Sequence, residues 1–257
     1  MGETKIGFPP NTLCAEAVRL DVLEAGGGYF VVNKPASVLL EAYPAAPKTK
    51  SLVAALRENP QKPEFARLSI TSPYSVNQLD FEMSGAAIIA CDKDSAARLR
   101  NSMWSGEMFF EYLVLARGGS DKGGEFSVNL PLLKHERRDI WIVSHRFGKK
   151  AQTHFKKIAE SRGFTLWRAR AEFARPHQIR AHAKEAGLRI AGENVYSRTL
   201  PVYMSEIKRD QYKLDRSLER ELPLYPHICV HLENANGARA PLPKGFAAAL
   251  KRLGLSS

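Results

Sequence analysis

The chain has 257 residues and a formal net charge of +11 at pH 7. Its hydrophobic fraction of 44% is enough for a large core, and its charged fraction of 25% is ordinary, so a disordered chain is excluded. No apolar run approaches the ~18 residues of a membrane-spanning helix, and the first residues contain no apolar signal core. The length corresponds to one large domain or two small ones.

The cysteines indicate the redox environment. Cys14, Cys91 and Cys229 are far apart and odd in number, so they predict neither a disulfide framework nor a CxxC metal site. Such usage is typical of a reducing compartment. We therefore expect an intracellular location, cytoplasmic or nuclear, with an organelle left open.

Positive charge is concentrated in the second half of the chain. Residues 1–90 carry eight Lys or Arg and nine Asp or Glu, whereas residues 134–180 carry 13 Lys or Arg and four acids. Such a run is either a solvated basic face or a surface for a polyanion such as nucleic acid. Aromatic residues within it could contact RNA or fill the core of strands. They are Trp141, Phe147, Phe155, Phe164, Trp167 and Phe173.

Hydrophobic patterning predicts the elements of the first half in chain order. A strand covers 29–33, a loop covers 73–85, and a short buried strand covers 86–91. Asp92 is expected to cap a helix over 93–104. A further strand covers 108–116, since apolar residues point to both of its faces.

The second half predicts more strands than helices. Strands are expected over 138–145 and 163–173, while 151–160 fits a helix face and a strand face equally well. Pro176 is expected at the first position of a helix that Gly187 ends. Two further helical segments are the charged stretch 204–222, as a helix or an insertion, and the amphipathic tail 244–254. This pattern predicts an α+β protein built on sheets.

Several kinds of catalytic site are absent from the sequence. His177 and His182 have poor spacing for joint metal ligation, and no phosphate-binding glycine loop or GxSxG motif is present. We therefore expect no metal site. The remaining candidates are Asp80 in a loop, Tyr112 within a strand and Arg180 near the start of a helix. Each alone is more often a turn, core or surface residue.

Five segments, in order, resemble one family. They are "YFVVNKPAS", "QLDFEMSGAAIIA", "FEYLVLARG", "RPHQIRAHAKEAGLRIAGENVY" and "APLPKGF". Together they resemble the RluA-type pseudouridine synthases. The resemblance implies a pseudouridine-synthase fold, an α+β structure whose mixed, mostly antiparallel sheet forms two halves flanking a catalytic cleft. It also implies conversion of uridine to pseudouridine in structured ribosomal or transfer RNA, with no cofactor.

The resemblance also implies roles for particular residues. Asp80 corresponds to the catalytic aspartate, Tyr112 to the tyrosine that packs against the target base, and Arg180 to the arginine that pairs with the aspartate. An RNA-facing role is implied for Lys34, Gln78, Leu79, His177 and Gln178. An ionised carboxylate suits the reaction, because it can attack the anomeric carbon or take a proton from the sugar. The uridine is expected to leave its helix, which costs a few kcal/mol.

Some positions depart from the family pattern. Asn77, Gln78 and Met83 differ from the usual HRLDxxTSG motif, and Glu193 follows Gly192 where the family has an aspartate. Gln78 replaces an arginine that enters the RNA, and glutamine supplies no cationic contact. One alternative is therefore a catalytically silent RNA-binding or ribosome-assembly factor with the same fold. A nucleotide-processing hydrolase would need a metal or a pair of acids, and neither is evident.

The resemblance begins at residue 29. We expect residues 1–28 to be an N-terminal extension and residues 29–257 to be the catalytic domain, without a separate N-terminal RNA-binding domain. A monomer is the default expectation for the oligomeric state.

Overall fold

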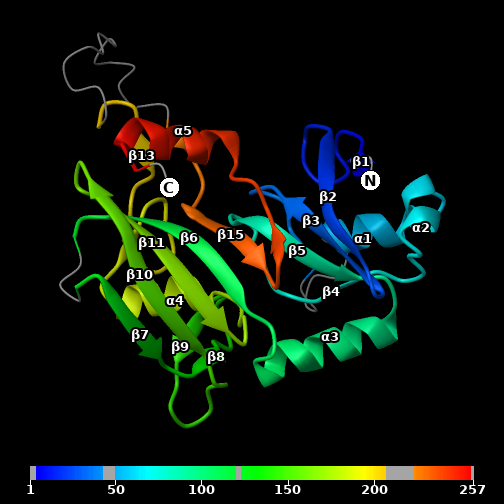
Figure 1. The fold of residues 1–257 in the computed structure, drawn as a ribbon, viewed down its shortest axis with the longest axis horizontal. Coiled ribbons are helices and arrows are strands. Elements are labelled where there is room, and N and C mark those ends of the chain that lie inside the picture. Colours follow the sequence, from blue (N-terminus) through cyan, green and yellow to red (C-terminus); the bar gives the residue numbers. More distant parts are fainter. Residues whose placement is uncertain (1–3, 43–49, 120–122, 207–222, 256–257) are drawn as a thin grey trace. The chain divides into compact units, whose positions relative to one another are not determined.

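The computed structural model describes residues 4–42, 50–119, 123–206 and 223–255 (Figure 1). The chain divides into two compact units. Unit 1 contains Met1–Glu111, Glu172–Pro176 and Leu232–Pro241, and unit 2 contains Tyr112–Ala171, His177–His231 and Leu242–Ser257. The positions of the units relative to one another are not determined, so each is described by itself.

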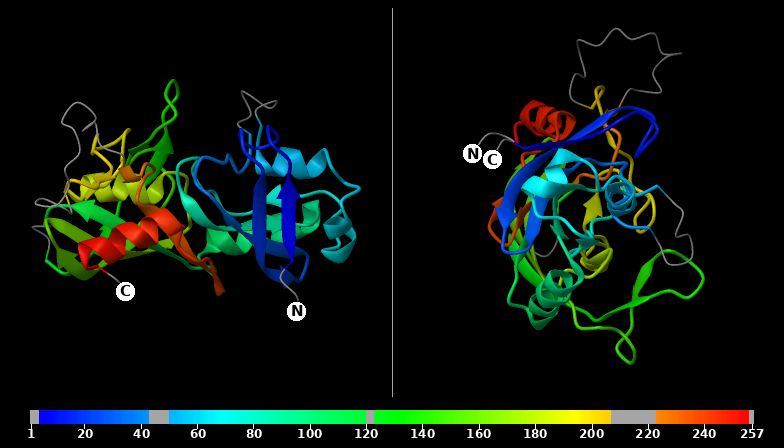
Figure 2. Two further views of the ribbon diagram at one scale, coloured as in Figure 1. Left: turned by 90° about the horizontal axis from the view of Figure 1, so that it is seen from above. Right: turned by 90° about the vertical axis from the view of Figure 1, so that its right-hand side faces the viewer.

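Unit 1 is built on antiparallel strands in the order β1-β2-β3-β5. Their bounds are β1 (Lys5–Phe8), β2 (Val18–Gly26), β3 (Tyr29–Lys34) and β5 (Ser84–Ala90), with β4 (Tyr74–Ser75) paired to β5. Figure 2 shows β1 and β2 side by side. The segment predicted as an N-terminal extension therefore supplies two strands of this sheet. Every residue of β5 is buried, which confirms the predicted buried strand. The strand begins at Ser84, two residues earlier than predicted.

Three helices accompany this sheet, namely α1 (Leu52–Arg57), α2 (Pro63–Arg67) and α3 (Lys93–Ser105). The Asp92 side chain accepts a hydrogen bond from the Ser95 backbone N–H at 2.8 Å. This interaction confirms the predicted N-cap of α3, and Gly106 ends the helix in a left-handed conformation. The short β16 (Ala238–Arg239) pairs with the end of β15 (Val230–Ala235).

Unit 2 contains strands in the order β6-β11-β10-β7, with β12 paired to β6. The bounds are β6 (Phe110–Arg117), β7 (Glu125–Asn129), β10 (Gln152–Ser161), β11 (Phe164–Glu172) and β12 (Arg189–Ile190). The segment that fitted both a helix and a strand is the strand β10. Its pairing with β7, from Gln152 opposite Asn129 to Lys156 opposite Glu125, settles the choice.

Two small antiparallel pairs and two helices complete unit 2. The pairs are β8 (Leu132–Lys134) with β9 (Trp141–Val143) and β13 (Val202–Tyr203) with β14 (Pro223–Tyr225). The helices are α4 (Gln178–Glu185) and α5 (Lys244–Leu253), and α5 confirms the predicted helical tail. The rings of Tyr225 and Phe246 stack at 5.3 Å and join β14 to α5.

The start of α4 differs from the prediction. Pro176 does not occupy the first helical position, because the helix begins at Gln178 and His177 is its N-cap. His177 has a left-handed backbone (φ 56°), and its Nδ1 contacts the Tyr196 hydroxyl at 3.0 Å. The N-cap thus has a backbone conformation that is uncommon for a residue other than glycine, and its side chain contacts a residue 19 positions further along the chain. Gly187 follows the helix with a positive φ, as predicted.

The α+β class with mostly antiparallel strands is confirmed, while a cleft between two halves stays a prediction. Of the aromatic residues in the basic stretch, Phe155, Phe164, Trp167 and Phe173 are buried, and Phe147 is exposed. Most of the charged segment 204–222 lies outside the described residues. Within the described part of the chain, no helix is long and apolar enough to cross a membrane.

Candidate active site

The loop before β5 alternates buried and exposed side chains. Asn77, Leu79 and Met83 are buried, Gln78 is exposed, and Asp80 is partly exposed. The Met83 backbone N–H donates to the Asp80 carbonyl at 3.1 Å, which closes a turn that begins at Asp80. The loop therefore presents its carboxylate on a short turn between two buried anchors.

Asn77 joins this loop to the sheet. Its Nδ2 donates to the Ala86 carbonyl at 3.1 Å, and its Oδ1 accepts from the Ile88 backbone N–H at 2.8 Å. The carboxamide thus bonds the β5 backbone as a neighbouring strand would. Asn77 differs from the usual residue of the motif, and its side chain is buried and supports the loop instead of being exposed on the surface.

Lys34, at the end of β3, lies beneath the same loop. Its side chain is fully buried, and Nζ donates to the carbonyls of Pro35 at 2.9 Å, Val38 at 2.7 Å and Met83 at 2.7 Å. A longer contact of 3.5 Å reaches the Phe81 carbonyl. Three short contacts match the three N–H donors of an ammonium group. Lys34 thus ties the turn after β3 to the loop that carries Asp80.

Burial lowers the pKa of Lys34 to about 7, and the negative charge of Asp80 opposes that change. Asp80 and Lys34 are therefore coupled electrostatically within unit 1. The sequence predicted an RNA-facing role for Lys34, but its ammonium is directed at protein carbonyls and has no exposed surface. The structure gives it the role of holding the Asp80 loop.

Lys34→Met should lower the free energy of unfolding by about 3 kcal/mol. At pH 6, below its pKa of about 7, Lys34 is protonated, so the buried carbonyls lose a charged donor, and relief from burying a charge offsets only part of this loss. Urea denaturation measures the change. Lys50→Met is the matched control, because Lys50 Nζ contacts one carbonyl, that of Asn11, and its side chain is exposed. Equal effects of the two substitutions would contradict the anchoring role.

A close backbone contact explains why a glycine follows Ser84 at position 85. Its φ is +129°, and a Cβ placed on it would lie 2.3 Å from the Leu232 carbonyl oxygen. The close approach of two backbones therefore leaves room only for glycine. The sequence predicted that Ser84 and Gly85 belong to the loop, but they are the first two residues of β5.

Gly85→Ala should lower the free energy of unfolding by about 3 kcal/mol, through a backbone clash and an unfavourable φ. Gly7→Ala in β1 is the matched control, because a Cβ there meets no atom within 4 Å. Thermal denaturation compares the two. A Gly85→Ala protein as stable as the Gly7→Ala protein would disprove the close approach.

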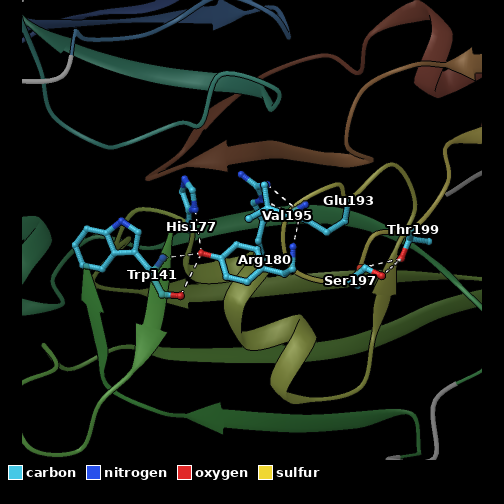
Figure 3. Close-up of polar contacts among 8 residues, drawn as sticks. Trp141, His177, Arg180, Glu193, Val195, Ser197 and Thr199 are labelled. Carbon is cyan, nitrogen blue, oxygen red and sulfur yellow. Dashed lines mark hydrogen bonds and ion pairs between the residues drawn. The ribbon is translucent and has the colours of Figure 1, made fainter. Parts of the chain in front are cut away.

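Tyr112 and Arg180 belong to unit 2. Tyr112 lies in β6 and is 4% exposed. Arg180 lies in the first turn of α4 and is buried beside Glu193. Its Nε donates to Glu193 Oε2 at 2.7 Å, and its Nη2 donates to Oε1 at 3.0 Å (Figure 3). Since Asp80 lies in unit 1, the pairing of Arg180 with Asp80 stays a prediction.

Glu193 is fixed by more than this ion pair. Its Oε1 accepts from the backbone N–H groups of Val195 at 2.7 Å and Tyr196 at 3.1 Å (Figure 3). Burial raises the pKa of the Glu193 carboxyl. The hydrogen bonds and charge of Arg180, with the two backbone N–H groups, outweigh burial and hold the pKa below its usual value. The pair is therefore ionised and oriented at neutral pH.

Comparison with known proteins identifies the family. A family model described as RNA pseudouridylate synthase matches residues 28–185, which is more than half of the chain. The chain belongs to this RNA pseudouridylate synthase family. The match includes Lys34, Asp80, Tyr112 and Arg180, whereas Glu193 lies beyond it.

Individual relatives agree with the family. The chain is 27% identical over 181 residues to ribosomal large subunit pseudouridine synthase D of Yersinia pestis, covering 70% of this chain and 54% of that protein. It is 29% identical over 182 residues to the protein of the same name in Salmonella typhimurium, covering 71% and 54%. This family member thus spans about half the length of the curated relatives it matches.

Solved structures of low sequence identity share the fold. Human RNA pseudouridylate synthase domain containing 4 has a TM-score of 0.67 at 17% identity, covering 92% of this chain and 94% of that chain. Human RNA pseudouridylate synthase domain containing 1 has a TM-score of 0.57 at 16% identity, covering 91% and 87%. The pseudouridine-synthase fold predicted from the sequence is confirmed.

In this RNA pseudouridylate synthase family member, one tyrosine hydroxyl organises the surroundings of α4. The Tyr196 hydroxyl accepts from the Trp141 backbone N–H at 2.8 Å and donates to the Trp141 carbonyl at 3.2 Å. It also contacts His177 Nδ1 at 3.0 Å (Figure 3). The Arg180 guanidinium lies 5.5 Å from the centre of the Tyr196 ring. Tyr196 therefore joins β9 to the start of α4.

Two further residues with a predicted RNA-facing role have buried side chains. Gln178 Nε2 donates to the Gln152 carbonyl at 2.9 Å and to Thr153 Oγ1 at 3.1 Å. Leu79 is buried between the exposed Gln78 and the partly exposed Asp80. The Gln178 side chain therefore joins the start of α4 to β10, and Leu79 supports the loop before β5. His177 and Gln78 are accessible, and their contact with RNA stays a prediction.

Sequence reasoning gave no site role to Asn77, Glu193 or Tyr196. Glu193 had the clearest signal, an acid within a segment that resembles the family. Among the described residues, no group of three or more His, Cys, Asp or Glu side chains is placed to hold a metal ion.

Proposed function

We propose that the protein is an RNA pseudouridine synthase that isomerises particular uridines in structured RNA. The observation that carries this proposal is the Asp80 carboxylate on a turn anchored by Lys34 and Asn77, in a chain that belongs to the RNA pseudouridylate synthase family. A fixed carboxylate suits a reaction whose transition state demands accurate placement.

In this proposal the N1–C1′ bond of uridine breaks and a C5–C1′ bond forms, with the C5 proton leaving and N1 gaining one. Asp80 attacks C1′ or accepts a proton from the sugar. Tyr112 packs against the detached base, and the Arg180 cation stabilises the ionised Asp80. Glu193 orients Arg180, because it holds the Nε and Nη2 groups of the guanidinium.

RNA is the proposed partner, with the target uridine flipped out of its stack. The net charge of +9 in residues 134–180 supports phosphate contacts, which weaken as salt rises. The names of the relatives make ribosomal large-subunit RNA the first substrate to test. A monomer in an intracellular reducing compartment is also proposed, and the three free cysteines support the compartment.

Mapping pseudouridine chemically tests the proposal. Purified protein is incubated with total RNA from cells that lack its gene, and the positions converted to pseudouridine are read out. The expected result is conversion of a small set of uridines in structured regions. RNA binding without conversion at any position would overturn the proposal.

That second result would support a catalytically silent RNA-binding factor. The exposed, uncharged Gln78 is the observation that favours this alternative, since glutamine lacks the charge of the arginine in the related motif.

A further inference from the structure

Phe81 is a large apolar side chain on the surface beside Asp80. It is 47% exposed and follows Asp80 directly. It occupies the second position of the turn that the Met83 N–H closes on the Asp80 carbonyl. A single exposed apolar side chain is common on protein surfaces, so the exposure alone implies no partner. What sets Phe81 apart is its place in the chain, directly after the candidate reactive carboxylate.

The backbone of Phe81 is held firmly. Its carbonyl accepts from the Ser37 N–H at 2.8 Å and lies 3.5 Å from Lys34 Nζ. Leu79 and Met83 are buried on either side of the turn. The ring is therefore displayed by a fixed turn, and its exposure does not come from a loose loop.

The geometry points to RNA as the partner of this ring. Phe81 is the residue next to Asp80 in the chain, and consecutive Cα atoms are about 3.8 Å apart, so its exposed ring is close enough to meet a base beside a uridine bound at Asp80. An aromatic face stacks on any base, whatever its sequence. The exposed Gln78 stands two residues before Asp80 and can hydrogen-bond to base edges.

We propose that Phe81 is an RNA-binding residue whose ring stacks on a base next to the uridine presented to Asp80. This inference rests on the proposed pseudouridine synthase function. Phe81 supplies contact area and orientation to the substrate strand, while Asp80 carries out the chemistry.

The test compares Phe81→Ala, Phe81→Trp and the control Trp104→Ala. Trp104 is a second exposed aromatic of unit 1, 50% exposed, and it lies on α3 away from the loop in sequence. The substrate is an RNA oligonucleotide that carries a site found by mapping with the wild-type protein. Phe81→Ala should lower kcat/KM about tenfold or more, as expected for loss of one base stack. Phe81→Trp and Trp104→Ala should stay within about threefold of wild type, since tryptophan still stacks.

A binding measurement separates stacking from a merely structural role. In the Asp80→Asn background, the same oligonucleotide carries 2-aminopurine on one side of the uridine and then on the other. Binding should quench its fluorescence at one of these positions, Phe81→Ala should abolish the quenching, and Phe81→Trp should restore it. The thermal midpoint should fall only slightly with Phe81→Ala, because the side chain is 47% exposed and the anchoring hydrogen bonds belong to the backbone.

The outcomes distinguish two failures. If wild type forms pseudouridine and Phe81→Ala matches it in both kcat/KM and quenching, the inference about Phe81 is wrong and the proposed function stands. If wild type forms no pseudouridine in any RNA, the proposed function fails, and the inference fails with it.

Discussion

Asp80→Asn should give a folded protein that binds RNA and forms pseudouridine about 10²- to 10⁴-fold more slowly than wild type, or not at all. Asparagine keeps the shape and can still accept a hydrogen bond, but it has no negative charge. It can neither attack the anomeric carbon nor remove a proton from the sugar. Asp80 is partly exposed, and its turn is closed through its backbone carbonyl, which the substitution retains.

Asp21→Asn is the matched control for this change. Asp21 is an exposed carboxylate of unit 1 that contacts Lys5 at 3.2 Å, so its loss should leave activity unchanged. Pseudouridine formation is measured by chemical mapping, and RNA binding by filter retention. Full activity of Asp80→Asn would exclude the assigned role, and parallel losses in both variants would indicate a general charge effect.

Glu193→Gln should lower the free energy of unfolding at pH 7 by about 3–5 kcal/mol, since it leaves the buried Arg180 guanidinium without its anionic partner. The glutamine oxygen can still accept from the Val195 and Tyr196 backbone N–H groups, but the amide nitrogen then replaces the oxygen that accepts from Arg180 Nε, so the variant removes the charge and one hydrogen bond of the pair. It should also lower activity, because the guanidinium loses the carboxylate that orients it.

The pH dependence of stability gives a second test of the pair. The pKa of Glu193 is lowered in the folded protein from its ordinary 4.5. The unfolded chain therefore binds a proton more readily, and the stabilisation is present above that ordinary value and is lost as pH falls through the folded pKa. The gap between wild type and Glu193→Gln should be large at pH 7 and shrink below pH 4.5.

Chemical denaturation at several pH values measures this gap. Glu185→Gln is the matched control, because Glu185 pairs with Lys184 at the surface. Exposed pairs contribute about 0–1 kcal/mol, so the control should change stability little at any pH. A gap for Glu193→Gln that does not vary with pH would contradict an ionised pair.

Elements governed by local signals could be predicted from the sequence. Both ends of α3 are marked by nearby residues, the N-cap Asp92 and the left-handed Gly106. The strand β5 follows from its apolar run. The ambiguity of 151–160 could not be resolved locally, because β10 is a strand through its pairing with β7. The N-cap of α4, His177, has a left-handed backbone and contacts Tyr196, 19 residues away, and neither feature is signalled by the local sequence.

The candidate site shows the same division. Asp80 could be found because it lies in a short motif that resembles a known family. The anchoring role of Lys34 could not be predicted, because a lysine is usually a surface residue. Only the structure shows that its ammonium group is buried and donates to carbonyls of two separate segments. The role of Glu193 depends on a contact 13 residues along the chain from Arg180. Sequence patterns identify reactive groups more readily than the residues that hold them in place.

The anchoring of the Asp80 loop limits how it can be transplanted into another protein. Residues 76–83 alone would lose the Lys34 ammonium, the Ser37 N–H and the β5 backbone to which Asn77 bonds. The smallest transferable unit therefore joins residues 34–38 with residues 76–88. Grafting the loop alone would transfer the Asp80 carboxylate without the hydrogen bonds that hold its loop in place.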